Sequence, residues 1–230
     1  MYLPFFDWTL ILLIPGMLFA FFAQWKVTST FKSLSQVRSS TGRTGRDVAE
    51  ALLAAHGVSG VRVEPVGGML SDHYDPTNRV LRLSDGVYGS DSVAAMGVAA
   101  HEVGHAIQHA QGYMPMRWRW ALLGPANLGS QLAFPLAFAG ILFGRAGGFL
   151  LDAAILLFAA AVLFHLVTLP VEFDASHRAY LNLQNAGIAP PQEAALAKRV
   201  LDAAALTYLA SAATALLTLL RLILIRQSRR

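Results

Sequence analysis

Apolar residues gather in four long stretches of the chain, separated by segments in which apolar and polar residues are mixed. Each stretch is close to the roughly 20 residues that an α-helix needs to cross a bilayer. Their ranges are 8–25, 121–143, 148–169 and 203–225. The second is the least apolar, because it contains Asn127, Ser130 and Gln131. The pattern predicts a mainly α membrane protein with about four transmembrane helices, in which residues 121–169 form a helical hairpin.

The more polar segments predict a small α+β domain whose two parts are residues 26–120 and 170–202. The stretch TGRTGRDVAEALLAAHG has the periodicity of an amphipathic helix. Thr44 and Asp47 have the spacing of a capping box at its start, and Gly57 suits its end.

Two short segments, VRVEPV at 61–66 and RVLRLS at 79–84, alternate as β-strands do. The turn-rich GGMLSDHYDPTNR lies between them. The next segment, SDSVAAMGVAAHEVGHAIQHAQG, predicts a helix that begins at a Ser or Asp cap and ends near Gly112. The predicted order in this domain is helix, strand, strand, helix.

Composition and charge narrow the class of protein. Hydrophobic residues make up 55% of the chain and charged residues only 14%, whereas soluble domains contain about 25% charged residues. The chain has no cysteine, which excludes disulfides, thiolate metal ligands and cysteine nucleophiles. The net charge is +4, and the basic residues lie close to apolar stretches. This placement indicates a topology signal and not a nucleic-acid-binding surface.

The distribution of basic residues predicts the orientation in the membrane. The leading peptide MYLPFFD has no Lys or Arg, unlike the start of a secretory signal peptide, which predicts an uncleaved first helix. Basic residues follow that helix at positions 26, 32, 38, 43 and 46. The positive-inside rule therefore places residues 26–120 in the cytoplasm, and the hairpin returns residues 170–202 to the same side. The same rule disfavours an outer location for the basic tail at 226–230, which leaves the path of the last apolar helix open.

The candidate chemistry lies in VAAHEVGHAIQHA, residues 98–110. On a helix, the Cβ atoms of His101 and His105 lie about 5–6 Å apart on one face, so both side chains can bind one metal ion. Glu102 lies one residue further round, where it can act as general base on a metal-bound water. The small residues Ala100 and Gly104 flank the motif. This HExxH pattern predicts the metal site of a zinc peptidase.

A third protein ligand has to come from elsewhere in the chain. His109 lies eight residues from His101, about 12 Å along a helix, which is too far for one ion. The segment LPVEFDASHRAY, which follows the third apolar stretch, offers Glu172, Asp174 and His177. Charge alone does not choose among these three.

Five blocks of the chain, in order, resemble the YugP-type neutral zinc metallopeptidases of bacterial membranes. They are TGRTGRDVAEALL, LSDHYDPTNRVLRLS, VAAHEVGHAIQHA, LPVEFDASHRA and AAALTYLASA. More distantly, the chain is similar to the HtpX-type and CAAX-processing peptidases. The third ligand of that wider group is the Glu of a helical ExxxD, so the resemblance implies one Zn²⁺ held by His101, His105 and Glu172. The Asp of that motif, which supports a ligand histidine, is Ser176 here, and Asp174 or a loop residue becomes the candidate for that role.

The resemblance implies a zincin-like metallopeptidase domain on the cytoplasmic side of a bacterial inner membrane, in a multi-pass, zinc-dependent endopeptidase. The expected partners are the lipid bilayer and a membrane-adjacent or misfolded peptide or protein substrate, with no nucleic acid. The main candidates for stabilising the oxyanion are His73 and Tyr208, with Tyr74 and Arg178 as alternatives. By analogy with other zinc peptidases, we expect the substrate to lie extended along strand 79–84 as an edge strand.

Two alternative functions stay open. An intramembrane site-2-type protease also has HExxH, with an Asp ligand from a later membrane helix, and Asp152 in LLDAAILL is the candidate. Ala153 in place of that motif's glycine, and the polarity of the HExxH segment, weigh against this assignment. The other alternative is a non-catalytic membrane scaffold or metal-binding protein.

Overall fold

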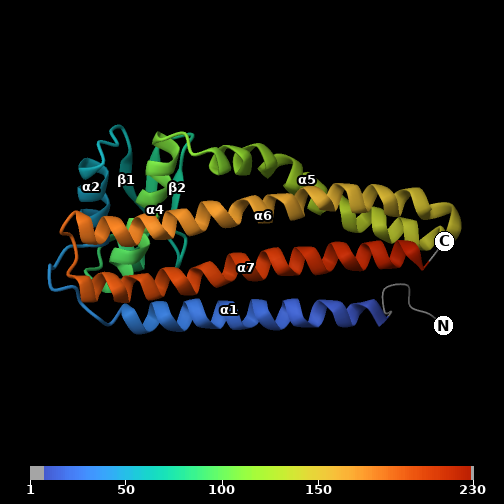
Figure 1. Ribbon diagram of the computed structural model, residues 1–230, viewed down its shortest axis with the longest axis horizontal. Coiled ribbons are helices and arrows are strands. Elements are labelled where there is room, and N and C mark those ends of the chain that lie inside the picture. Colours follow the sequence, from blue (N-terminus) through green and yellow to red (C-terminus); the bar gives the residue numbers. More distant parts are fainter. Residues whose placement is uncertain (1–7, 229–230) are drawn as a thin grey trace. The chain divides into compact units, whose positions relative to one another are not determined.

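The computed structural model describes residues 8–228, and Figure 1 shows its ribbon with some of the helices and strands labelled. In chain order the elements are η1 (Trp8–Leu12), α1 (Leu13–Leu34), α2 (Gly45–Ala55), β1 (Arg62–Val66), β2 (His73–Asp75), β3 (Val80–Ser84), α3 (Asp85–Tyr88), α4 (Val93–Ala110), α5 (Met114–Leu142), η2 (Gly144–Gly147), α6 (Gly148–Asn185) and α7 (Pro191–Gln227). The chain falls into two compact units: unit 1 has residues 1–23, 117–169 and 207–230, and unit 2 has residues 24–116 and 170–206. The leading peptide predicted to be uncleaved, and the last two arginines of the basic tail, lie outside the described residues.

Unit 1 consists of apolar parts of the helices α1, α5, α6 and α7. Its core is built mainly from small and aliphatic side chains of the last three of these helices, among them Ala133, Ala137, Leu151, Ala154 and Leu222. Many large apolar side chains remain exposed on the outside of the unit, including Ile11, Phe21, Phe134, Phe149 and Leu156. An apolar exterior of this kind is suited to lipid and not to water.

Three helices among the described residues are long and apolar enough to cross a membrane: Trp8–Leu34, Gly144–Asn185 and Pro191–Gln227. They include three of the four predicted apolar stretches. Helix α5 contains the second stretch but is not among the three. That stretch is diluted by Asn127, Ser130 and Gln131, the residues that made it the least apolar of the four.

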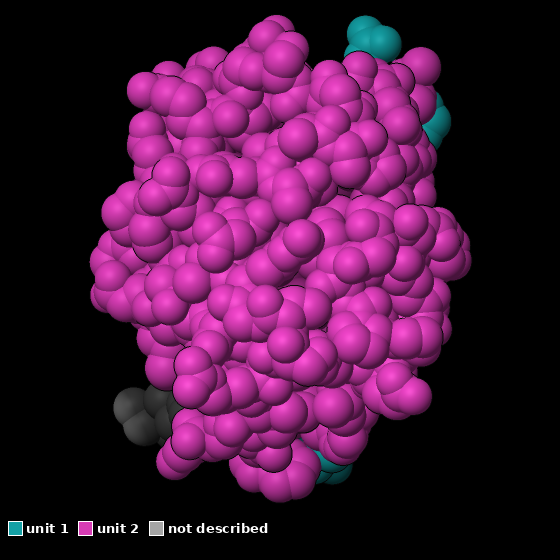
Figure 2. All heavy atoms as spheres, turned by 90° about the vertical axis from the view of Figure 1, so that its left-hand side faces the viewer, with its two compact units in different colours: residues 1–23, 117–169, 207–230 teal, residues 24–116, 170–206 magenta. Residues whose placement is uncertain are grey.

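Unit 2 contains the three-stranded sheet, and Figure 2 shows one face of this unit in magenta. The strand order is β1-β3-β2, with β1 parallel and β2 antiparallel to β3. The central strand β3 is the most deeply buried of the three, and its side chains Val80, Leu81 and Leu83 are fully covered. The sheet packs against α4, which also contacts α2.

The sheet corrects two sequence-based expectations. The segment interpreted as turn-rich contains β2, which is only three residues long and therefore too short to show alternation. Strand β3 was expected to be an edge strand that binds substrate, and this is wrong because β1 and β2 occupy both of its sides. The predicted turn follows β2 directly: the Asp75 carboxylate accepts hydrogen bonds from the backbone N–H groups of Thr77 and Asn78.

The predicted helix boundaries in unit 2 follow from local capping. Asp47 N–H donates to the Thr44 hydroxyl at 3.2 Å, and Thr44 N–H donates to the Asp47 carboxylate at 2.9 Å, which forms the predicted capping box of α2. At the start of α4 the Ser92 hydroxyl accepts a hydrogen bond from Ala95 N–H at 3.2 Å, a single cap without the reciprocal bond. Gly57 and Gly112 follow the two helices with φ of 64° and 65°, conformations that favour glycine.

Helix α6 does not end at Pro170, the residue directly after the predicted apolar stretch 148–169. It continues to Asn185 with the proline inside it. Proline removes one helical hydrogen bond and costs about 3 kcal/mol within a helix. The residues after it compensate, because Val171, Ala175, Ala179 and Leu183 recur at four-residue intervals and are all fully buried. Burial of this stripe keeps α6 helical through the segment that contains Glu172.

Candidate metal centre

Helix α4 holds the HExxH motif inside unit 2. Except for its last two residues and Val98, which is half-buried, the helix is buried along its whole length. His101, Glu102 and His105 are exposed by only 8%, 8% and 7%. Polar side chains at this depth require partners, because an unpaired buried polar group costs about 1–3 kcal/mol. The contacts of these three residues therefore indicate what the site is built to hold.

A close approach of α6 to α4 places Glu172 beside the two histidines. A Cβ atom at Gly104 would lie 2.8 Å from the carbonyl oxygen and 3.2 Å from the Cα of Ala175, so only glycine permits this approach without a shift. Glu172 Oε2 then lies 3.2 Å from Nε2 of His101 and 3.5 Å from Nε2 of His105. The Glu172 side chain is almost completely buried.

These three side chains form a group that fits a metal ion. One potential ligand atom from each lies within 4.8 Å of the others. A zinc ion about 2.0–2.1 Å from each of three tetrahedral ligands requires those ligand atoms to be about 3.3 Å apart. The two distances to the Glu172 oxygen lie on either side of that value. Two imidazoles and a carboxylate are also a standard ligand set for catalytic zinc.

Hydrogen bonds behind the histidines fix the orientation of their rings. The amide nitrogen of Gln108 donates to the carbonyl oxygen of Val171 and to the Asp174 carboxylate, both at 2.8 Å. Its amide oxygen therefore faces Nδ1 of His105, at 3.0 Å, and accepts the proton of that atom. Nε2 of His105 is thereby left to face Glu172. Arg178 Nε donates to the same Asp174 oxygen, Oδ2, at 2.6 Å and holds that carboxylate in place.

The Ser176 hydroxyl lies 3.2 Å from Nδ1 of His101. The resemblance predicted an aspartate at this position, and the serine present there contacts a histidine of the candidate metal site. Asp174, the proposed substitute, touches neither histidine directly and reaches His105 only through Gln108. Gln108 was not among the residues that the sequence predicted for this site. The available signal was its position three residues after His105, on the same face of α4.

The electrostatics of the site follow from burial and from the Glu172 charge. Burial raises the pKa of Glu102, and this effect exceeds the opposing charges of the two histidines. A raised pKa is typical of a carboxylate that accepts and releases a proton near neutral pH. Burial lowers the pKa of His105, but the hydrogen bond and charge of Glu172 outweigh it, so the net shift is upward.

The other predicted residues lie outside the three-residue group. His73 is an exposed residue of β2, and its ring nitrogens face the Ser71 carbonyl oxygen and the Arg82 guanidinium. His109 is exposed, and its Nδ1 lies 2.9 Å from the Tyr74 hydroxyl. Tyr208 belongs to unit 1, whereas His101, His105 and Glu172 belong to unit 2. The oxyanion roles of His73 and Tyr208 stay predictions.

Asp152, the third ligand of the intramembrane alternative, has a different partner. Both of its carboxylate oxygens accept hydrogen bonds from Arg226, at 2.8 and 2.9 Å. The two residues lie together in unit 1. Of the remaining candidates, Asp174 binds Gln108 and Arg178, and His177 is exposed. Within residues 8–228, the group of His101, His105 and Glu172 does not include any of them.

Comparisons with known proteins point in the same direction as the geometry. The model of a family described as “Putative neutral zinc metallopeptidase” matches residues 9–227. A protein named “Putative membrane protease YugP” from Bacillus subtilis (strain 168) is 45% identical over 214 residues, which cover 93% of this chain and 94% of that protein. No solved structure matches the chain.

Proposed function

Because this chain belongs to the neutral zinc metallopeptidase family, we propose that it is a membrane-embedded endopeptidase with one zinc ion held by His101, His105 and Glu172. The convergence of the two Nε2 atoms on one oxygen of Glu172, at 3.2 and 3.5 Å, is the observation that supports this proposal. Zinc bound there would lower the pKa of a water to about 7 and polarise the peptide carbonyl.

Glu102 provides the general base in the proposed reaction. It adjoins His101 in the chain, it is buried, and its raised pKa makes its carboxylate a stronger proton acceptor than an exposed one. Glu102 takes a proton from the attacking water and passes it to the nitrogen of the leaving amine. His73 and Tyr208 are proposed as hydrogen-bond donors to the developing oxyanion.

The substrate is proposed to be an extended segment of a membrane-adjacent or misfolded protein. With β3 in the centre of the sheet, β2 is an edge strand, and it packs against α4, the helix of the HExxH motif. Asp72, the residue directly before β2, is close enough for its charge to raise the pKa of Glu102. A peptide paired with the backbone of β2 would gain affinity from main-chain hydrogen bonds.

The finer membrane arrangement is part of the proposal. We place four transmembrane segments in a bacterial inner membrane, with the metal centre on the cytoplasmic side. The basic residues that follow the first helix support this orientation. The Asp152–Arg226 ion pair supports four crossings, because it joins the start of α6 to the end of α7 within unit 1. The Asp152 carboxylate also neutralises the charge of Arg226, which the positive-inside rule disfavours on the outer side.

The substitution Glu102→Gln tests the proposed function. The variant should keep one zinc per chain and lose roughly 10²–10⁴-fold in peptidase rate, because general-base catalysis typically contributes that factor. Zinc content and hydrolysis of casein are measured on the same purified protein. Glu50→Gln, an exposed glutamate on α2, is the matched control and should keep full activity. Near-normal turnover in Glu102→Gln would contradict the mechanism, and zinc without any hydrolysis in wild type would favour the non-catalytic alternative.

A further inference from the structure

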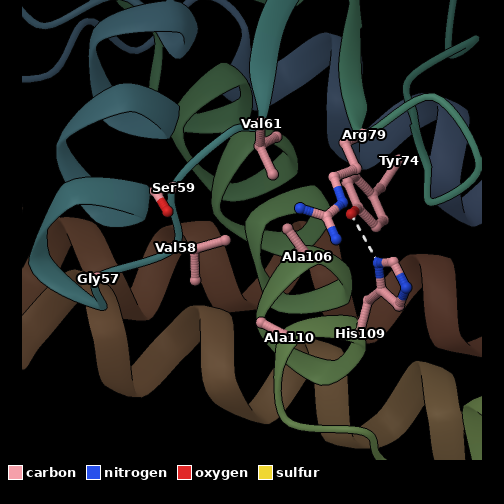
Figure 3. Close-up of a pocket in the computed structure, with 9 residues that line it drawn as sticks. All are labelled: Gly57, Val58, Ser59, Val61, Tyr74, Arg79, Ala106, His109 and Ala110. Carbon is pink, nitrogen blue, oxygen red and sulfur yellow. Dashed lines mark hydrogen bonds between the residues drawn. The ribbon is translucent and has the colours of Figure 1, made fainter.

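Unit 2 contains a polar cavity, of about 310 Å³, near the end of α4 (Figure 3). Its wall is formed by the loop 57–61 between α2 and β1, by Tyr74 of β2, by Arg79, and by the last turns of α4. On α4 the side chains facing the cavity are only Ala106 and Ala110, which leave space, and His109. Small side chains therefore line the cavity along α4, and polar side chains line another part of its wall.

The polar side of the cavity presents hydrogen-bond donors and a positive charge. The Tyr74 hydroxyl lies 2.9 Å from Nδ1 of His109, which leaves Nε2 of that ring without a partner among the described residues. The Arg79 charge is close enough to the Tyr74 hydroxyl to oppose the rise in its pKa that burial causes. Figure 3 shows Arg79, Tyr74 and His109 extending toward the same space beside Ala106.

Arg79 has no carboxylate partner among residues 8–228, although neighbouring arginines of the sheet do. Arg62 pairs with Glu64 at 3.5 Å, and Arg82 pairs with Asp75 at 3.4 Å. Arg79 also has φ of 52°, a left-handed conformation that is uncommon for residues other than glycine and asparagine. Its carbonyl oxygen accepts a hydrogen bond from Arg62 N–H at 3.1 Å, which fixes the backbone where the side chain enters the cavity.

We propose that this cavity binds a carboxylate group of the peptide substrate, through the Arg79 guanidinium with His109 and Tyr74 beside it. Arginine matches the planar geometry of a carboxylate with two parallel hydrogen bonds. The inference rests on the proposed function, since it names a feature of the peptide that the candidate metal centre would cleave. The carboxylate belongs to an Asp or Glu side chain or to the C-terminus of the peptide, because both present the same group.

The position of the cavity on α4 sets the distance to the bond that is cleaved. His109 lies one turn beyond His105, about 6 Å along the helix axis at 1.5 Å per residue. An extended peptide covers about 3.3–3.6 Å per residue. For a peptide that runs parallel to α4, the recognised carboxylate lies about two residues from the scissile bond.

Binding of four fluorescent peptides tests this inference without any need for catalysis. The peptides share one sequence and have either Glu or Gln at one position, and either a free or an amidated C-terminus. Anisotropy is measured on Glu102→Gln protein in detergent, so that no peptide is cleaved. We expect tighter binding of the Glu peptides, of the free C-terminal peptides, or of both, and the amidated series separates the two sources of the carboxylate.

The variant Arg79→Asn, added to the same protein, removes the guanidinium and keeps a residue that tolerates positive φ. It should weaken binding of the preferred carboxylate peptide by about tenfold and leave the neutral, amidated peptide unchanged, because a hydrogen-bonded charge is lost. Arg43→Asn changes the net charge equally at an exposed position outside the cavity and should have no effect. Ala110→Leu, which fills the cavity from the exposed end of α4, should also remove the preference.

Equal binding of all four peptides, or an Arg79→Asn effect that Arg43→Asn reproduces, would overturn the inference. Hydrolysis of the neutral, amidated peptide by wild-type protein is measured separately. If that hydrolysis is absent while the carboxylate preference and its loss in Arg79→Asn persist, the peptidase proposal fails and the binding site stands. If hydrolysis is present without any carboxylate preference, the binding site fails and the peptidase stands.

Discussion

At the scale of single residues, the side chain with the most constrained role is Gln108. It is completely buried, and its amide uses both of its hydrogens on Val171 and Asp174. Its oxygen is therefore directed at His105, where it determines which ring nitrogen keeps a proton. A histidine protonated at Nδ1 offers Nε2 to a metal, and hydrogen bonds of this type increase metal affinity.

We predict that Gln108→Met weakens zinc binding by about 10–100-fold, because it removes the group that orients His105 while roughly preserving side-chain volume. Zinc affinity is measured by titration against a competing chelator, and nitrogen NMR of the histidine reports its tautomer. The exposed Gln36→Met is the control and should bind zinc as wild type does. An unchanged affinity in Gln108→Met would show that the amide only fills space.

The residues of the candidate site differ in how far the sequence reveals them. His101, Glu102 and His105 are predictable because their roles depend on helix periodicity within five residues of chain. Glu172 lies 71 residues from His101. The local pattern left it equal to Asp174 and His177, and only the family resemblance selected it. The contacts of Gln108 depend on how α6 packs, and the sequence contains no local signal for that packing.

At the scale of secondary-structure elements, the candidate metal centre depends on the approach of α6 to α4. Gly104 allows the backbone of Ala175 to approach, and three residues before that contact α6 contains Glu172. The sequence indicated a small residue at this position but not which helix would pack there. The predicted apolar stretch also ends at residue 169, whereas α6 continues through Pro170 because the burial of the residues after it arises from tertiary packing.

We predict that Gly104→Ala destabilises the protein and weakens zinc binding. Alanine in a helix interior is favoured over glycine by about 1 kcal/mol, but overpacking a close contact typically costs about 1–3 kcal/mol. With a Cβ only 2.8 Å from the Ala175 oxygen, the steric term should dominate and displace Glu172. Thermal unfolding and zinc affinity are compared with Gly89→Ala, where the added Cβ meets no atom within 4 Å. Stability equal to or above wild type in Gly104→Ala would refute the packing argument.

At the scale of the whole molecule, segments that belong to unit 1 alternate along the chain with segments that belong to unit 2. Apolar stretches of α1, α6 and α7 belong to unit 1, while the HExxH motif and Glu172 belong to unit 2. The sequence predicted where the apolar stretches lie, because hydropathy depends only on composition. Helices α6 and α7 each run without a break through an apolar stretch and a part of unit 2. The sequence could not predict this continuity, because two separate helices would show the same periodicity as one continuous helix.

We predict that residues on both sides of the proposed hairpin face the cytoplasm. The chain has no cysteine, so single cysteines introduced at the exposed positions Lys32 and Asn185 can be labelled without interference. Both should react only when an impermeant reagent has access to the cytoplasmic side, as the positive-inside rule requires. Reaction of the two positions from opposite sides would exclude a metal centre assembled from His101 and Glu172 on one side of the membrane.

The most direct test of the central claim is the zinc content of purified protein. Wild type should bind one zinc ion per chain, and Glu172→Ala should lose it, because two histidines alone leave the site one protein ligand short. Asp152→Ala and His109→Ala should retain zinc, since neither side chain belongs to the three-residue group. Full zinc occupancy in Glu172→Ala, or its loss in Asp152→Ala, would contradict the assignment and favour the intramembrane alternative.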